Sequence, residues 1–408
     1  MHRKQWVLGV LAASVMTAST LVAGPLPAQA ATATPLPPTI NGVVYVANAA
    51  ELEYIDQNFS HYAAASIALT ANINLQGYAW QPWNGFTGNG FTGTLNGNGY
   101  TIENLSVSTT DSDSGLIGNL NGGTVENLGL VNPTVSATGP SLGGALVGNA
   151  GASSHLTNVY VQGGSVTGQH LGYPTGLGGL VGYLASGTVT NAYSTAAVSS
   201  TTVTGGTAIG GFIGFSAGTV TGGVWDAAAA TATGPSAVGT GPITGIVSDT
   251  ATQMQTPSDQ ATAYPGWNFT TVWTQSAGQF PTLRATPPAV PSLTVTASPG
   301  STVGSETLSA TPNTAGDTFA VQVSSAAPAP VALGATPPSG ATAYTVGSSI
   351  PNVAPGDIVT LYEVSPSGAV VAAGSVTANV TAAAPTKTTL AVISDSRSSL
   401  PIRDRLSA

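Results

Sequence analysis

Acidic side chains provide the first candidates for chemistry in this 408-residue chain. Glu103 and Glu126 each precede an asparagine in a repeated phrase, so stacked repeats would bring the two carboxyl groups one strand apart. Ionised carboxylates repel at the strand spacing of roughly 4.8 Å, which raises the pKa of at least one of them. Such a pair could hold a cation or serve as the acid pair of a glycan-cleaving site. The alternative is two solvated side chains.

A second acidic segment, Asp111-Ser-Asp113-Ser-Gly115, is similar to the opening of a calcium-binding loop. It lacks the third oxygen position and the bidentate glutamate that usually closes such a loop. Aspartate and serine are also common turn residues. We therefore expect no metal ion and no other cofactor, with Ca²⁺ at Asp111 and Asp113 as the alternative.

Aromatic side chains could bind sugar rings by stacking. Four of them fall within nine residues, namely Tyr78, Trp80, Trp83 and Phe86. They form a candidate ligand platform, although aromatic residues at the end of a stacked repeat also seal an apolar interior. The same two roles apply to three tryptophans that we place at the other end, Trp225, Trp267 and Trp273.

The histidines and serines form no recognisable catalytic motif. His155 begins one repeat and His170 follows it, but no third metal ligand accompanies them. The Gly-x-Ser-x-Gly letters of a nucleophile elbow occur at 139–143 and 214–218, but they fall inside the glycine-rich repeats, where no strand-to-helix turn is expected. We therefore predict no catalytic residues.

Short apolar runs bounded by small residues recur in the first half of the chain. The candidate acidic and aromatic residues lie within or beside these repeats, so the repeat must position them. They read Gly115-Leu-Ile-Gly118, Ala145-Leu-Val-Gly148, Gly179-Leu-Val-Gly182 and Gly211-Phe-Ile-Gly214. The closing glycines are 30, 34 and 32 residues apart, a period typical of stacked repeats. The large residues are expected to cover the interior, while the glycines permit bends and close approach of neighbouring coils.

A second phrase recurs around an asparagine. It reads Ile102-Glu-Asn104-Leu-Ser-Val107, Val125-Glu-Asn127-Leu-Gly-Leu130, Leu156-Thr-Asn158-Val-Tyr-Val161 and Val189-Thr-Asn191-Ala-Tyr-Ser194. Its apolar spacing breaks the alternation of a strand, which predicts a corner between two short strands. Asparagine tolerates left-handed backbone angles there, and Gly222 holds the position in a fifth copy. Stacked corners would align the four asparagines as a ladder of amide hydrogen bonds; the alternative is isolated turn residues.

These repeats resemble those of the GLUG-motif family of bacterial secreted and surface proteins. The lead-in 78–107 and the closing segments GVWD, GWNFTTVW and FPTLR are similar to those of the family, so the resemblance covers about 45–284. It implies a right-handed parallel β-helix in an exported, often surface-associated protein, and it implies little about activity. Some family members carry a zinc peptidase module, but this chain has no His-Glu-x-x-His motif.

Composition limits the partners of the protein. The absence of cysteine excludes disulfides and thiolate chemistry. Only 6% of residues are charged, and Arg284 is the one basic residue between positions 5 and 386. This excludes nucleic acid as a partner, because a phosphate backbone is bound by clustered Lys and Arg. The scarcity of cations fits an acidic environment, and a solenoid that is simply rich in uncharged polar residues is the alternative.

Both ends of the chain differ from the repeats. Residues 1–30 have a basic start, an apolar run and an Ala28-Gln29-Ala30 cleavage site, which predicts a signal peptide and export without a membrane span. A helix near 51–60 is expected to cap the first coil. Short alternating runs over 293–382 favour an immunoglobulin-type sandwich.

The sequence thus predicts an all-β protein, a right-handed parallel β-helix followed by a C-terminal immunoglobulin-like β-sandwich. Its predicted parts are a signal peptide (1–30), a linker (31–44), a capped repeat β-helix (45–284), a Pro-rich linker (285–292), the sandwich (293–382) and a flexible tail (383–408). The predicted function is a secreted or cell-surface, non-catalytic scaffold that binds glycans or other surface proteins. The alternatives are a polysaccharide-cleaving β-helix enzyme and a self-assembling envelope component.

Overall fold

The computed structural model describes residues 36–83, 90–139, 142–169, 175–201, 207–229 and 236–380. The predicted signal peptide, Phe86, His170 and the tail lie outside these ranges, so the expectations for them stay predictions. Within the described ranges no helix has both the length and the apolar character needed to cross a membrane.

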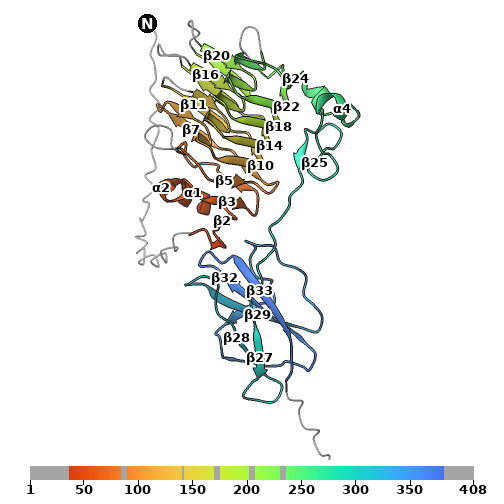
Figure 1. Cartoon of the computed structure of the whole chain (residues 1–408). Helices are drawn as coiled ribbons and strands as arrows, with labels where there is room; N and C mark the ends of the chain where they lie inside the picture. The colour runs from red at the N-terminus through yellow and green to blue at the C-terminus, as the bar shows by residue number, and fades with distance from the viewer. Residues whose placement is uncertain are drawn as a thin grey trace, which may run out of the picture. The chain divides into compact units, whose positions relative to one another are not determined.

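The first part of the chain winds into stacked coils of parallel strands (Figure 1). The first sheet has eleven strands in the described part of the chain: β1 (Thr39–Ile40), β2 (Val43–Val46), β3 (Ser66–Leu69), β4 (Ile73–Asn74), β5 (Thr94–Asn96), β6 (Thr101–Glu103), β10 (Thr124–Val131), β14 (His155–Gln162), β18 (Thr188–Ser194), β22 (Thr219–Asp226) and β24 (Ile246–Asp249). A second sheet comprises β7 (Ser106–Thr109), β11 (Thr134–Ala137), β15 (Ser165–Gly168) and β19 (Ala197–Ser200). A third comprises β8 (Asp113–Ser114), β12 (Leu142–Gly144), β16 (Thr175–Gly178) and β20 (Thr207–Gly210). The fourth comprises β9 (Ile117–Leu120), β13 (Val147–Ala150), β17 (Val181–Leu184), β21 (Ile213–Ser216) and β23 (Val238–Thr240).

One coil visits each sheet once, as β10, β11, β12 and β13 do before the chain returns to the first sheet at β14. Parallel pairing keeps successive repeats in register, so that Val125, Leu156, Val189 and Val220 lie above one another. The predicted parallel β-helix is therefore confirmed, since the repeats pair as stacked parallel strands and not as separate antiparallel hairpins.

The interior of the coils is a continuous apolar column. The first large residue of each glycine-bounded run is fully buried in it, namely Leu116, Leu146, Leu180 and Phe212. Burying each such side chain stabilises the fold by about 1.5–3 kcal/mol. The glycine-bounded runs thus cover the interior, as predicted.

A short helix joins this core at the N-terminal end. Helix α1 (Ala49–Gln57) begins where the side chain of Asn48 accepts a hydrogen bond from the Glu51 amide, and α2 (Phe59–Tyr62) follows it. Leu52 and Ile55 are fully buried among residues of the first coils. The predicted helix is confirmed, and its apolar face covers the start of the solenoid core.

The segment after β24 runs along the outside of the first sheet. It contains α3 (Ala251–Met254), a 3₁₀ turn (Pro257–Asp259), α4 (Gln260–Ala263), β25 (Trp273–Thr274) and β26 (Thr282–Leu283). Trp267 and Trp273 pack there against Tyr160 and Tyr193, whose rings stack at 5.0 Å on the outer face. The prediction that Trp267 and Trp273 seal the end of the solenoid is therefore wrong. The outward tyrosines offer them an apolar surface on its side, and Trp225 lies within the solenoid core.

The remaining strands form two antiparallel sheets. One sheet holds β27 (Thr296–Pro299), β28 (Glu306–Ser309) and β31 (Ser349–Ile350). The other holds β30 (Thr342–Tyr344), β29 (Thr318–Ser324), β32 (Ile358–Val364) and β33 (Val370–Thr377). Leu308 from the first sheet and Leu361 from the second share one apolar core. This part of the chain therefore has a core separate from that of the solenoid.

Candidate functional site

The two glutamates that suggested an acid pair are not stacked. Glu126 lies in register with Asn96 and Thr157, whereas Glu103 is the partner of Val131. Glu126 Oε1 accepts a hydrogen bond from Asn96 at 2.8 Å, and Glu103 Oε1 accepts one from Thr101 at 3.0 Å. The prediction of stacked carboxylates is wrong because the two phrases occupy different corners of the coil.

Asparagines at the first corner do form a ladder. Asn191 donates to Asn158 at 3.4 Å, Asn158 to Asn127 at 3.1 Å and Asn127 to Asn96 at 3.3 Å. The backbones of Asn127, Asn158 and Asn191 have φ of 50° or 51°, in the left-handed region that asparagine tolerates. The amide side chains therefore lock successive corners together.

Asn104 belongs to a second corner, which corrects its predicted place in the ladder. Its amide donates to Asn74 at 3.0 Å, and Asn132 follows at the equivalent position one coil later. Asn104 and Asn132 have φ of 56° and 51°, so this corner also needs a left-handed residue. Gly163 holds the position in the next coil. The sequence signal for this corner was Asn132-Pro133, which a search for the first phrase passes over.

Glycines let neighbouring coils approach each other closely. A Cβ atom at Gly148 would lie 2.7 Å from the Gly118 carbonyl, and one at Gly182 would lie 2.6 Å from the Gly148 carbonyl. A Cβ atom at Gly214 would likewise lie 2.5 Å from the Gly182 carbonyl. At the opening of the runs, a Cβ atom at Gly115 would clash with the Gly144 carbonyl and one at Gly179 with the Gly211 carbonyl. A Cβ atom at Gly211 would clash with the Trp225 ring. These repeat glycines have a packing role.

The aromatic cluster near the N-terminal end is mostly buried, which contradicts its use as an exposed ligand platform. Trp80 and Trp83 are each 1% exposed, and Trp83 stacks on Phe59 of α2 at 5.4 Å. The Trp80 indole donates to the Leu116 carbonyl at 2.8 Å. The rings are buried because they complete the apolar column beneath the helical cap, and Phe86 lies outside the described residues.

Tyr78 remains half-buried, and its hydroxyl donates to Asp56 at 3.0 Å. Burial raises the pKa of Asp56 to about 6, since desolvation outweighs the hydrogen bonds from Gln81 and Tyr78. Burial is also the first cause that raises the pKa of Tyr78 to about 12. The pair therefore holds the cap in place as a neutral phenol bonded to a carboxyl group.

Asp111 and Asp113 do not form a recognisable metal site. Asp113 is 8% exposed, and burial raises its pKa to about 7, with a smaller contribution from Asp111. The Asn149 side chain lowers this pKa by hydrogen bonding. No three His, Cys, Asp or Glu residues of the described ranges group as metal ligands. His155 is exposed and bonds to Thr188 at 2.8 Å.

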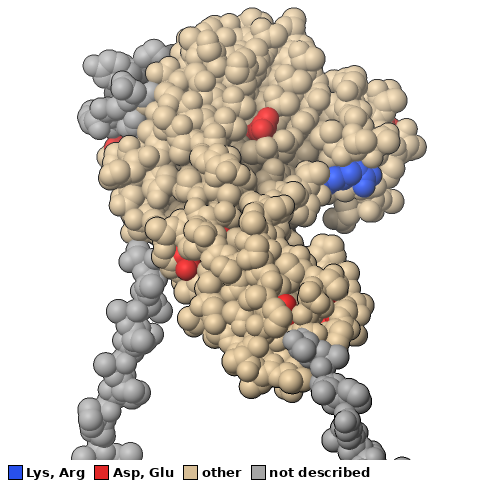
Figure 2. All heavy atoms as spheres, turned by 60° about the horizontal axis from the view of Figure 1, so that its bottom comes forward, with Lys and Arg blue, Asp and Glu red and all other residues tan. Residues whose placement is uncertain are grey.

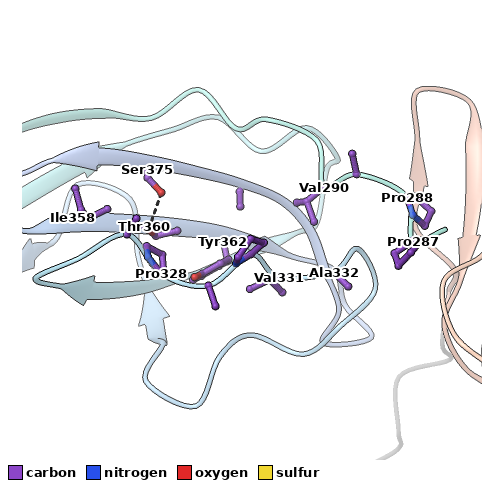
Figure 3. Close-up of a pocket in the computed structure, with 15 residues that line it drawn as sticks. Pro287, Pro288, Val290, Pro328, Val331, Ala332, Ile358, Thr360, Tyr362 and Ser375 are labelled. Carbon is purple, nitrogen blue, oxygen red and sulfur yellow. Dashed lines mark hydrogen bonds between the residues drawn. The ribbon is translucent and has the colours of Figure 1, made fainter. Parts of the chain in front are cut away.

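The C-terminal part has a groove that the sequence did not predict (Figure 3). It has a volume of about 780 Å³ and lies over strands β32 and β33. Residues 287–290 and 327–332 form its walls, and Ile358, Thr360 and Tyr362 belong to its floor. The Ala-Pro-Ala-Pro run at 327–330 was its sequence signal, since alternating prolines favour an extended wall with few amide donors.

The groove offers apolar contact and few polar groups. Thr360 and Ser375 bond to each other across its floor at 2.8 Å, and the Tyr362 hydroxyl donates to Gln322 at 3.0 Å. None of the residues that line it is charged. Such a surface suits an apolar or proline-containing extended segment.

Comparison with protein families gives one match in this region. Residues 298–394 match the family described as "S-layer protein SbsC C-terminal domain". The match includes the strands β28 to β33 and extends past the last described residue, 380.

Two curated proteins share shorter stretches with this chain. "Halomucin" from Haloquadratum walsbyi is 41% identical over 122 residues, which are 28% of this chain and 1% of that protein. The "Putative Gly-rich membrane protein" from Evansella cellulosilytica is 36% identical over 99 residues, 24% of this chain and 11% of that protein. The chain thus spans only a small fraction of these relatives.

Among solved structures, the chain is similar to a "putative immunoglobulin A1 protease" from Bacteroides ovatus. The similarity covers 60% of this chain and 92% of that chain, with 17% identity and a TM-score of 0.36.

Proposed function

We propose that this chain is a secreted, non-catalytic surface protein with a structural or adhesive role. The observation that carries the proposal is the match of residues 298–394 to an S-layer domain, joined in one chain to a parallel β-helix. A stack of coils supplies a long regular surface, and its stability comes from repeated neighbour contacts. The coils project the protein, and the C-terminal part joins it to the envelope lattice.

The finer fold assignments belong to this proposal. A right-handed solenoid is supported by the strong preference of parallel strand connections for that hand. An immunoglobulin-like sandwich is supported by the order β27-β28-β31 facing β30-β29-β32-β33, with Ser292 bridging in parallel to Ala373. Membership of the GLUG-motif family is supported by the equivalent places of Gly118, Gly148, Gly182 and Gly214 in successive coils.

The partner is proposed to be a cell-surface glycan or another surface protein. Arg284 is the only Lys or Arg within the described ranges, and its guanidinium donates to the carbonyls of Trp273 and Phe269. Contacts would therefore come from amides, hydroxyls and apolar surface, with little ionic contribution. Figure 2 agrees with this, since the visible face is almost entirely uncharged.

Co-sedimentation with isolated cell envelopes tests the role. The mature chain from residue 31 should pellet with envelopes and resist extraction at high salt, because the proposed contacts are not ionic. Protein that stays in the supernatant would contradict the proposal. A parallel assay for reducing ends released from a polysaccharide panel should give none, and release would instead support a glycan-cleaving enzyme.

A further inference from the structure

Two acidic side chains of the C-terminal part meet on the inner face of its larger sheet. Asp317 ends the turn before β29, and Glu363 lies near the end of β32. Phe319 is the direct partner of Glu363, so Asp317 is its diagonal neighbour on the same face. Diagonal positions of an antiparallel pair are within reach of long side chains.

Glu363 is fully buried, and its two oxygens have different environments. Oε1 accepts a hydrogen bond from the backbone amide of Thr314 at 3.1 Å, while Oε2 is buried with no partner. Asp317 Oδ2 is also buried without a partner. A buried carboxylate oxygen without a donor is costly, so two of them side by side call for a positive species between them.

No side chain nearby supplies that species. The described part of the C-terminal sheets contains neither Lys, Arg nor His, and its other acids are Glu306 on β28 and Asp357 before β32. Asp357 lies at the opposite end of β32 from Glu363, and it accepts a hydrogen bond from the Ala354 amide. A proton from solvent is the smallest positive species that could join the two carboxyl groups.

We propose that Asp317 and Glu363 share one proton and so form an acid-dependent latch that holds the turn 313–317 onto strand β32. Below the transition a carboxyl group donates to its carboxylate neighbour, and the Thr314 amide completes the link to Glu363. When the proton leaves, the buried Glu363 carboxylate and the half-buried Asp317 carboxylate repel each other, and the turn detaches.

The direction of the titration agrees with this geometry. Burial is the first cause that raises the pKa of Asp317 to about 6, and Glu363 raises it further. The folded state therefore binds the proton more tightly than the unfolded chain. The latch is fully formed below pH 3.8, the ordinary pKa of an aspartate, and it weakens as the pH rises through about 6.

Hydrogen exchange measured by mass spectrometry on the full chain tests the latch. After correction for intrinsic rates, the protection of residues 313–317 should fall at least several-fold between pH 5 and pH 7.5. Asp317→Asn should keep it at pH 7.5, because the amide donates permanently where the carboxyl group loses its proton. Asp357→Asn, at a carboxylate bonded only to a backbone amide, should titrate like the unchanged protein.

Three outcomes would overturn the proposal. One is equal protection of this turn at both pH values, and another is an Asp317→Asn variant that is as pH-dependent as the unchanged chain. The third is protection restored by millimolar Ca²⁺ at pH 7.5, which would assign the site to a cation. Should Asp317→Asn not fold, the carbon chemical shifts of the carboxyl groups in the unchanged protein must show an apparent pKa above 5 for the pair.

Discussion

Single residues decide where the coils turn and how closely their sides approach. The asparagine corners combine a left-handed backbone with a side-chain hydrogen bond to the next coil. The glycines of the apolar runs leave space that only a hydrogen atom fills. Substitutions can test both roles. Glycine in place of asparagine keeps the left-handed backbone but removes the side-chain hydrogen bonds, and alanine in place of glycine adds a single methyl group.

Asn158 tests the corner. Asn158→Ala should destabilise the solenoid by roughly 2–3 kcal/mol, because the left-handed backbone is strained and two ladder bonds are lost. Asn158→Gly removes the bonds alone and should cost roughly 1–2 kcal/mol. Urea unfolding followed by tryptophan fluorescence measures the difference. Equal losses for the two variants would show that the backbone angle is unimportant.

Gly182 tests the close approach. Gly182→Ala places a methyl group 2.6 Å from the Gly148 carbonyl and 2.7 Å from the Gly143 amide, so overpacking should cost about 1–3 kcal/mol. Gly151→Ala is the matched control, since its nearest atoms lie at 3.4 Å, and it should stay within about 0.5 kcal/mol. Equal unfolding midpoints for the two variants would contradict the packing argument.

At the scale of strands and helices, part of the fold could be predicted from the sequence. The period of the glycine runs and the first asparagine corner predict parallel coils, and the spacing of Leu52 and Ile55 predicts the cap. The register between strands could not be predicted. Ile102-Glu-Asn104 has the same residue pattern as the first corner, but it pairs with the strand segment that leads into the second corner. Only pairing between coils, which a single sequence does not report, separates Glu103 from Glu126.

The prediction for Trp267 and Trp273 was wrong for a related reason. Sequence order places Trp267 and Trp273 after the last coil, which suggests an end cap. The chain instead turns back along the outer face, where the outward side of strands β14 and β18 carries Tyr160 and Tyr193. The sequence alone did not indicate that these tyrosines face outward, so no surface for the segment to cover was predicted.

This covering segment gives a prediction at the scale of elements. Trp273→Ala should destabilise the chain by about 3–5 kcal/mol, because the indole is fully buried between the segment and the tyrosine stack. Trp273→Phe keeps an aromatic ring and should lose less. Circular dichroism during urea unfolding reports both. A Trp273→Ala variant as stable as the unchanged protein would mean that the segment is not a structural part of the solenoid.

The whole molecule is poor in cations, and the described carboxyl groups with shifted pKa values all shift upward: Glu51, Asp56, Asp113, Asp249 and Asp317. Burial is the first cause in each case. The ordinary pKa of an aspartate is 3.8, but the pKa of Asp56 is raised to about 6 and that of Asp113 to about 7. The folded chain therefore binds protons at these carboxyl groups more tightly than exposed aspartates do.

Stability should consequently rise as the pH falls. The folded state holds these protons more tightly than the unfolded chain. Their contribution to the free energy of unfolding is therefore fully present below about pH 3.8, and it is lost as the pH rises through 6 to 7. The urea midpoint at pH 4.5 should exceed that at pH 7.5. Loss of the fold between pH 5 and pH 3 would contradict the account of the buried acids.

Location is the most direct test of the proposed surface role. Antibodies raised against the purified solenoid should label intact cells of the source organism, as seen by immunogold electron microscopy on unpermeabilised samples. Gold particles should be distributed along the outer envelope. Labelling that appears only after the cells are permeabilised would contradict it.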